Sequence, residues 1–169
     1  MRQEDLTVVK YRMDRRVTYH RAVTEYPELD VVFDCSDPDR VARFWMTAVP
    51  GYDFPSGPPD GYATWEEWAD ANDIPEDQRN TARTLIDKAG HRPTIFFNQV
   101  PEPKPAGKNR LHLDIKVAPG LSADERRARI EAEASRLEAA GATIARRIEE
   151  PDRFWIIMRD VEENEFCVI

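Results

Sequence analysis

Leu29-Asp30-Val31-Val32-Phe33-Asp34-Cys35-Ser36-Asp37-Pro38 is the stretch that decides the fold of this 169-residue chain. From Leu29 to Cys35, apolar residues alternate with a set that contains Asp30 and Asp34, which predicts a strand with two unlike faces. A helix is predicted to follow, because Ser36 can act as a cap and Pro38 is tolerated in a first helical turn. Apolar residues then recur at helical spacing up to Val49, and Pro50-Gly51 ends the helix.

The same order of elements occurs twice along the chain. After the first helix, the sequence predicts short strands at residues 52–54, 82–87 and 93–99. A strand at 110–117 and a helix at 122–140 follow, because Ser122 and Glu125 have the spacing of a capping box and Gly141 can stop the helix. Three more strands are predicted at 143–148, 153–159 and 165–168.

This internal repeat predicts an α+β fold of two βαβββ modules that form a cupped mixed sheet around a cleft. Residues 28–107 make up the first module and 108–169 the second, while 1–27 form an N-terminal extension. Each module has one helix to cover one face of its strands, so the polar faces remain for the cleft. A concave surface of this kind is the usual place for a small-molecule ligand. The polar faces carry Asp30 and Asp34 in the first module, and His112, Asp114 and Lys116 in the second.

Two segments lie outside the repeat. Residues 55–81 interrupt the first module with a proline- and glycine-rich loop, in which Thr64-Trp65-Glu66-Glu67 predicts a short capped helix. Trp65 and Trp68 on that helix indicate either a flap over an apolar ligand or a local hydrophobic plug. Residues 1–27 alternate like strands and are rich in Lys and Arg, which indicates an arm packed on the body of the protein or on a second subunit. A nucleic-acid contact is the less favoured alternative for this arm.

Composition excludes several classes of partner. The chain has 32 acidic and 24 basic residues, for a formal net charge of −8, whereas a broad nucleic-acid surface or docking on an anionic membrane needs an excess of base. No apolar run approaches the roughly 20 residues of a membrane span, and the N-terminus lacks the order of a signal peptide. Cys35 and Cys167 are far apart in sequence, which is typical of a reducing compartment. We therefore expect a cytoplasmic protein with no nucleic-acid or membrane partner.

Four segments resemble the glyoxalase-like proteins of the vicinal oxygen chelate superfamily, which includes glyoxalases, bleomycin-resistance proteins and dioxygenases. They are the opening stretch with Ala42-Arg43-Phe44-Trp45, and the segments Phe96–Lys104, Lys108–Asp114 and Asp160–Cys167. The resemblance covers residues 29–169, and the insert Trp65–Pro75 resembles one seen in actinobacterial members. It implies the two-module fold, a small-molecule ligand or substrate and a homodimer. It is much less specific for function, because one fold hosts many chemistries.

The metalloenzymes of this superfamily take ligands from inward-facing positions on the first and last strands of each module. By resemblance these positions are Asp30, Phe96 or Phe97, His112 and Cys167. An aromatic carbon cannot bind a metal, so the usual set of two histidines and two carboxylates is broken, and no metal or other cofactor is favoured. The alternative is a zinc site, or a site for another divalent metal, formed by Asp30, His112 and Cys167, since three protein ligands and a water make a catalytic zinc arrangement.

Catalysis without a metal stays open through His112 and Glu165. Glu165 shares a sheet face with Cys167, and a carboxyl group in an apolar cleft suits a general base because burial disfavours its charged form. The structural alternative is a turn-closing carboxylate paired with Arg159 or another basic residue. Cys167 can act as a nucleophile only if His112 meets it and activates it.

Three classes of function follow from these observations. The favoured one is a protein that binds a small organic molecule in the cleft between the modules. Its aromatic contacts would be Phe96, Phe97, Trp65 and Trp68, and its polar contacts Asp114 and Lys116, of which Lys116 could hold one carboxylate. The alternative is a metal-dependent lyase or isomerase of glyoxalase type. A third, weaker class is an interaction protein whose N-terminal arm mediates assembly.

Overall fold

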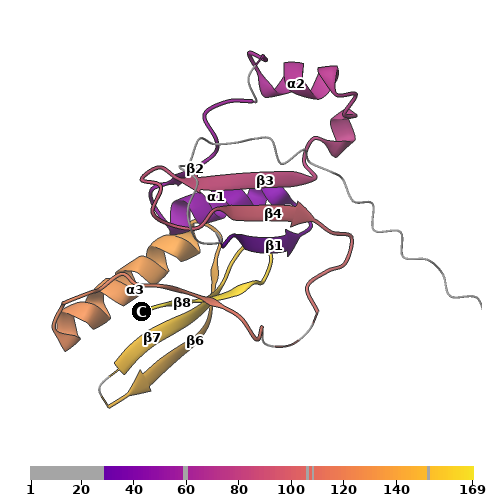
Figure 1. The fold of residues 1–169 in the computed structure, drawn as a ribbon. Coiled ribbons are helices and arrows are strands. Elements are labelled where there is room, and N and C mark those ends of the chain that lie inside the picture. The colour runs from indigo at the N-terminus through magenta and orange to yellow at the C-terminus, as the bar shows by residue number, and fades with distance from the viewer. Residues whose placement is uncertain (1–28, 59–60, 106, 108, 152) are drawn as a thin grey trace, which may run out of the picture.

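The computed structural model describes residues 29–169 except 59, 60, 106, 108 and 152, so the predicted arm at 1–27 lies outside the described residues. Two four-stranded mixed sheets make up the fold (Figure 1). The first contains β1 (Val31–Cys35), β2 (Tyr52–Asp53), β3 (Ala82–Asp87) and β4 (Ile95–Gln99), in the order β1-β4-β3-β2. The second contains β5 (Leu113–Ile115), β6 (Thr143–Glu150), β7 (Arg153–Arg159) and β8 (Glu165–Val168), in the order β5-β8-β7-β6.

One long helix belongs to each sheet. Helix α1 (Pro38–Ala48) follows β1, and α3 (Ala123–Ala139) follows β5, so the predicted α+β fold of two βαβββ modules is confirmed. Helix α2 (Trp65–Ala71) and the 3-10 turn η1 (Glu76–Gln78) lie in the predicted insert, which stands beyond β3 on the side away from the second sheet (Figure 1). Within the part of the chain that the structure describes, no helix is long and apolar enough to cross a membrane.

The helix starts follow local capping, with one difference from the prediction. Ser122 and Glu125 form the reciprocal capping box expected for α3, and Gly141 has the positive φ of 104° that ends such a helix. Helix α1 is capped by Asp37, whose side chain accepts a hydrogen bond from the Arg40 amide, and not by Ser36. The Ser36 hydroxyl instead donates to Glu162 at 2.8 Å, because the turn between β7 and β8 packs against this point.

Strand β5 is shorter than the predicted strand at 110–117. Its ladder partner among the described strands is β8, which is only four residues long, and the parallel pairing runs from Leu113↔Phe166 to Ile115↔Val168. Upstream of this pairing, the Asn109 amide donates to the Glu165 carboxylate at 2.8 Å. At this point a hydrogen bond to the Glu165 side chain takes the place of the backbone hydrogen bonds of the sheet. His112 lies just before β5.

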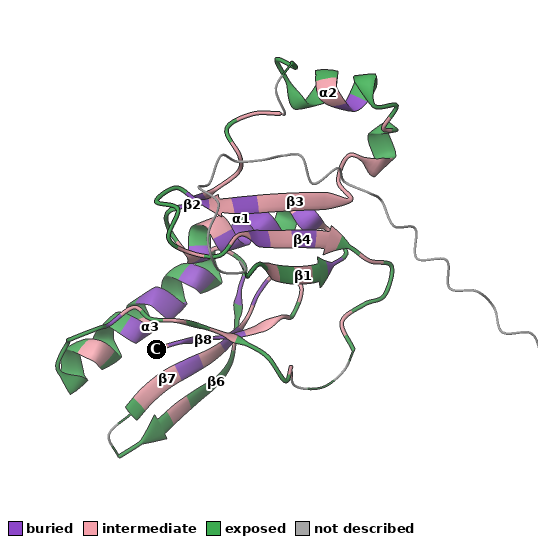
Figure 2. Ribbon diagram, viewed as in Figure 1, coloured by how far each residue is buried: buried purple, intermediate pink, exposed green. Residues whose placement is uncertain are grey.

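A single core joins the two modules. Its buried residues come from α1 and β4 in the first module and from α3, β7 and β8 in the second (Figure 2). The Trp45 ring lies between Phe33, at 5.0 Å between ring centroids, and Phe166, at 5.5 Å. The Trp45 indole N–H donates to the buried Asp160 carboxylate at 3.1 Å. These contacts hold the first helix of one module against the last turn and strand of the other.

Candidate functional site

A cavity of about 390 Å³ lies between the edge strands of the two sheets. Its walls come from β1, from the linker between β4 and β5, and from the start of β8. The apolar lining residues are Val31, Val32, Phe33, Val100, Pro103, Pro105, Leu111 and Leu113. The polar lining residues are Asp34, Glu102, Lys104, Asn109, His112, Asn164 and Glu165.

The linker borders a second cavity, of about 460 Å³. The two cavities share Asp34, Asn164 and the linker residues Glu102–Pro105, so this proline-rich segment forms part of the wall of both. The second cavity is more strongly charged, with Arg159, Glu162 and Glu163 in its lining. Glu162 accepts hydrogen bonds from the backbone amides of Ser36 and Asp37, so it joins the turn between β7 and β8 to the residues that precede α1.

Three potential metal donors meet on the open face of the second sheet. His112 and Asp114 are two residues apart, and Asp114 is the register partner of Cys167 on β8. One donor atom from each residue lies within 4.8 Å of the other two. The His112 Nε2 atom is 3.6 Å from the Asp114 Oδ1 atom. His112 also lines the first cavity, so this cluster lies at the cavity's border.

Asp30 is not part of this cluster. The sequence prediction combined Asp30 with His112 and Cys167, but the structure brings Asp114 to the other two. The reason is strand pairing: β5 and β8 are hydrogen-bonded neighbours in one sheet, whereas Asp30 precedes β1 in the other sheet. The donor set of one imidazole, one carboxylate and one thiol still fits a zinc ion with an open fourth position.

Glu165 anchors the linker. Its carboxylate accepts the Asn109 amide hydrogen bond, while the predicted partner Arg159 pairs with Glu163 at 3.1 Å. Glu165 lines the first cavity together with His112, so the structure brings the two predicted catalytic residues to one cavity. Their roles in acid–base chemistry stay a prediction.

The two phenylalanines of β4 face opposite sides of the first sheet. Phe97 is fully buried and stacks on Phe33 at 5.4 Å, so it belongs to the core and not to the cleft for which it was predicted. Phe96 pairs in register with Val32 and is half-buried on the opposite face. The correction follows from the alternation of side chains along a strand, since only one of two neighbouring residues can face a cleft.

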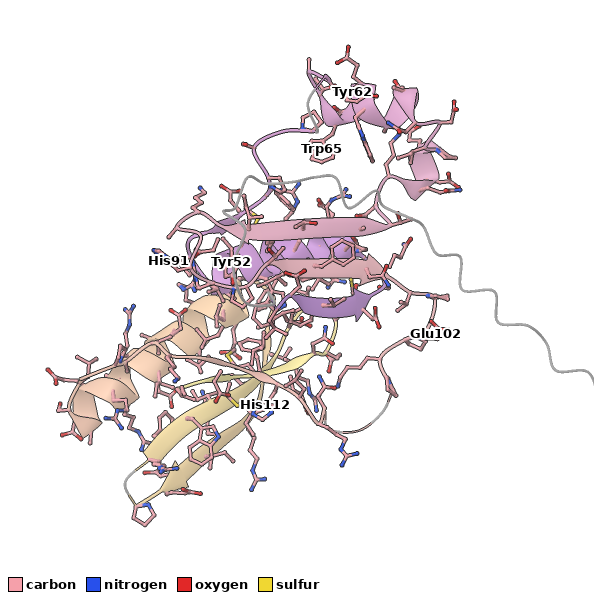
Figure 3. The ribbon with its side chains drawn as sticks, in the orientation of Figure 1. Tyr52, Tyr62, Trp65, His91, Glu102 and His112 are labelled. Carbon is pink, nitrogen blue, oxygen red and sulfur yellow. The ribbon has the colours of Figure 1, made fainter. Side chains whose placement is uncertain are left out.

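The tryptophans of the insert lie away from both cavities. Trp65 and Trp68 pack edge to face on α2 at 5.6 Å, and neither lines a cavity. Figure 3 shows Trp65 beyond the first sheet, on the side away from His112. This placement favours the local plug over the flap. Lys116, which is exposed beyond the end of β5, lines neither cavity.

The sequence interpretation missed the apolar cavity residues Val32 and Leu111. Val32 is 60% exposed and Leu111 is 78% exposed, so both leave apolar surface accessible beside the cavity. Val32 had a usable signal, because it stands between Asp30 and Asp34 on the otherwise polar face of its strand. Lys104 had no such signal, since it lies in an irregular linker.

The two cysteines lie in different environments. Burial, followed by the charge of Glu162, raises the pKa of the Cys35 thiol to about 12. Cys35 therefore keeps its proton at neutral pH, and its Sγ donates to the Asn98 carbonyl at 3.7 Å. Cys167 is the cysteine that lies beside an imidazole.

Two βαβββ modules with a cavity between their edge strands define the vicinal oxygen chelate fold. The chain belongs to the glyoxalase-like domain family, whose family model matches residues 30–169. A comparison with curated proteins gives no match.

Solved structures share the fold at low sequence identity. A glyoxalase/bleomycin resistance/dioxygenase family enzyme from Burkholderia phytofirmans is 17% identical, with a TM-score of 0.52, over 83% of this chain and 97% of that one. The fosfomycin resistance protein FosX from Listeria monocytogenes is 8% identical, with a TM-score of 0.53, over 86% and 93%. FosX from Mesorhizobium loti is 13% identical, with a TM-score of 0.51, over 86% and 92%. At these identities the likeness carries the fold alone.

Proposed function

We propose that the protein binds a small organic molecule in the cavity between β1 and β5. The observation that carries this proposal is a cavity of about 390 Å³ walled by both modules. This volume is in the usual range for small-molecule sites, roughly 300–1,000 Å³. The exposed apolar side chains of Val32 and Leu111 would gain free energy by covering an apolar ligand.

The polar groups of the cavity would orient the ligand. Lys104 and His112 can donate hydrogen bonds to an oxygen-bearing group, and the Asn164 amide can both donate and accept. The ligand that fits best is therefore mostly apolar and carries at least one polar oxygen. Binding of small molecules is a general property of the glyoxalase-like family.

The test replaces an apolar side chain on each cavity wall with a neutral polar one. The fluorescent apolar anion anilinonaphthalene sulfonate is titrated into the wild type and into Val32→Asn and Leu111→Asn, because a new basic residue would attract this dye. We expect roughly tenfold weaker binding in both variants, the loss that follows when about 1.4 kcal/mol of apolar contact is removed. Leu29→Asn is the matched control, because Leu29 is 73% exposed and does not line the cavity. Equal dye binding in all four proteins would refute the proposal.

A second candidate function is a metal-dependent lyase or isomerase of glyoxalase type. The donor cluster at His112, Asp114 and Cys167 favours it, because His112 belongs to both the cluster and the cavity lining. A bound divalent ion would polarise a substrate oxygen or activate a water. Turnover that is lost on chelation and restored by zinc, in a screen of oxygen-rich substrates, would support this candidate. Turnover that is indifferent to chelation would contradict it.

We also propose that the protein is a cytoplasmic homodimer. Family resemblance supports the dimer, and the two widely spaced cysteines support the reducing compartment. Sedimentation that shows only monomer at micromolar concentration would contradict the dimer. If the N-terminal arm mediates assembly, removal of residues 1–27 will reduce the mass measured by light scattering.

A further inference from the structure

We propose that the insert surface, residues 62–79 between β2 and β3, is the docking site for the basic N-terminal arm of the same chain. The arm comprises residues 1–27, which lie outside the described residues, and the sequence leaves open whether it packs on the body of the protein or on a second subunit. The insert surface lines neither cavity, so the proposal goes beyond ligand binding and does not depend on it.

The short helix of the insert leaves aromatic surface uncovered. The rings of Trp65 and Trp68 pack edge to face at 5.6 Å, yet Trp65 is still 37% exposed, and Tyr62 just before the helix is 36% exposed. Within the described part of the chain, α2 makes no extensive contact with another helix or strand, and Figure 2 shows it exposed along most of its length. Exposed aromatic rings on a helix without a partner are typical of a surface that another segment covers.

The same surface carries a concentrated negative charge. Six acidic residues and one basic residue occupy positions 65–79, which gives this stretch a net charge of −5 out of −8 for the whole chain. Two of the six acids have partners within the insert, because Asp70 pairs with Arg79 and Glu67 accepts a hydrogen bond from the Ala63 amide. The other four are exposed and have no ion-pair partner among the described residues: Glu66, Asp73, Glu76 and Asp77. A cationic segment lying against them would relieve their mutual repulsion.

The arm has the complementary charge and a matching apolar pattern. Residues 8–21 include five basic residues and one acid, so this part of the arm carries a net charge of +4. Arginine side chains pair with carboxylates and stack on aromatic faces, so they suit a surface built from acids and tryptophans. Apolar side chains such as Tyr11 and Val17 stand between the basic ones and can cover the exposed rings. A single exposed ion pair contributes little, so docking would depend on several such pairs acting together.

The chain is long enough for the arm to reach the insert of its own chain. The arm ends just before β1, and β4 and β3 lie between β1 and the insert (Figure 1). Neighbouring strands are about 4.8 Å apart, so the distance across these strands is roughly 10–15 Å. The stretch from Arg16 to Leu29 spans up to about 43 Å when it is extended. Such a short tether gives an effective concentration near millimolar, which favours the insert of the same chain over that of a second copy.

Chymotrypsin digestion of the full-length protein under native conditions tests the docking. The protease cuts after Tyr11 and Tyr19 in the arm, and cleavage after Leu111, which is 78% exposed, serves as the internal reference. Relative to this reference, Glu66→Gln/Glu76→Gln should speed cleavage of the arm at least about threefold at low salt. In 1 M NaCl the screening length falls to about 3 Å, so this difference should disappear.

Two further sets of variants separate docking from other effects. Glu138→Gln/Glu150→Gln is the matched control, because it removes two exposed acids from the second module, and it should leave the rate of arm cleavage unchanged. Arg15→Glu/Arg16→Glu should speed arm cleavage by a similar factor to the insert variant. Combining it with Glu66→Lys/Glu76→Lys should restore protection, because the charges are then exchanged between the two surfaces.

Carbodiimide coupling identifies the surface on which the arm lies. Lys10 is the one lysine of the arm, and the reagent joins its amine only to a carboxylate in direct contact. In a mixture of isotopically light and heavy protein, we expect Lys10 to be coupled to acids of the insert surface, always within one chain.

Three results would overturn the proposal. Coupling between a light and a heavy chain would show that a second copy supplies the arm, and coupling of Lys10 to acids outside residues 62–79 would place the arm on another surface. Arm cleavage that responds equally to Glu66→Gln/Glu76→Gln and to Glu138→Gln/Glu150→Gln would show that only the overall charge of the protein matters. Dye binding in the cavity is measured on the same variants and should not change, so the docking and the proposed binding function fail separately.

Discussion

Replacement of Trp45 by phenylalanine tests how the two modules are held together. Trp45 is 1% exposed, and its indole N–H donates at 3.1 Å to Asp160, which is equally buried. The ring also contacts Phe33 in its own module and Phe166 in the other. The substitution removes this hydrogen bond and part of the ring while keeping an aromatic group in place.

The cost can be estimated from these contacts. A hydrogen bond to a charged acceptor contributes about 1.5–3 kcal/mol. The smaller ring leaves a cavity that costs roughly 1–2 kcal/mol more. We therefore expect Trp45→Phe to lower the free energy of unfolding by about 2.5–5 kcal/mol, a large share of the stability of a typical domain.

Urea denaturation at pH 7, followed by circular dichroism, measures this cost. A double-mutant cycle with Asp160→Asn should give a coupling of about 1–2 kcal/mol between the two side chains, because each variant weakens the same hydrogen bond. The slope of the unfolding free energy against urea concentration should not change, because one core joins both modules and they unfold together. The matched control is Trp65→Phe on the exposed face of α2, where we expect a loss below about 0.5 kcal/mol. A cost below about 1 kcal/mol for Trp45→Phe, or a coupling below about 0.3 kcal/mol, would refute this account of the module contact.

Three further predictions follow from individual side chains. The hydrogen bonds from Arg92 and from the His91 amide lower the pKa of the Asp87 carboxyl group. The charged carboxylate therefore stabilises the folded protein above about pH 4, and this stabilisation is lost as the pH falls further. The difference in urea midpoint between wild type and Asp87→Asn should therefore narrow from pH 7 to pH 3, and a widening difference would contradict this. With a pKa of about 12, Cys35 should resist iodoacetamide in the native protein at pH 8 and react only after unfolding, as peptide mass spectrometry can show. Glu165→Gln should weaken the hydrogen bond from the Asn109 amide and so speed limited proteolysis of the linker at 101–110 several-fold. An unchanged cleavage rate would count against the anchoring role of Glu165.

The candidate site could be predicted from sequence only in part. His112 can be identified from sequence because it alone keeps the residue type that the resemblance leads one to expect at its position, and the structure places it at both the cavity and the donor cluster. The sequence places Asp114 among the ligand contacts and not in the metal set, because no local pattern tells which strand lies beside Cys167. It places both Phe96 and Phe97 in the cleft, because pairing with β1 and β3 sets which of the two faces the core.

Local sequence patterns determined which elements form and which faces of them are apolar. Their causes act within a few residues: side chains alternate along β1, Ser122 and Glu125 cap α3, and Gly141 supplies the positive φ that ends it. Only the tertiary structure decided which faces meet. The Trp45–Asp160 hydrogen bond joins residues 115 positions apart, and the pairing of Asp114 with Cys167 joins two separate strands. Such contacts depend on how the two sheets pack around one core, and the free energy of that packing is shared among residues that no local pattern connects.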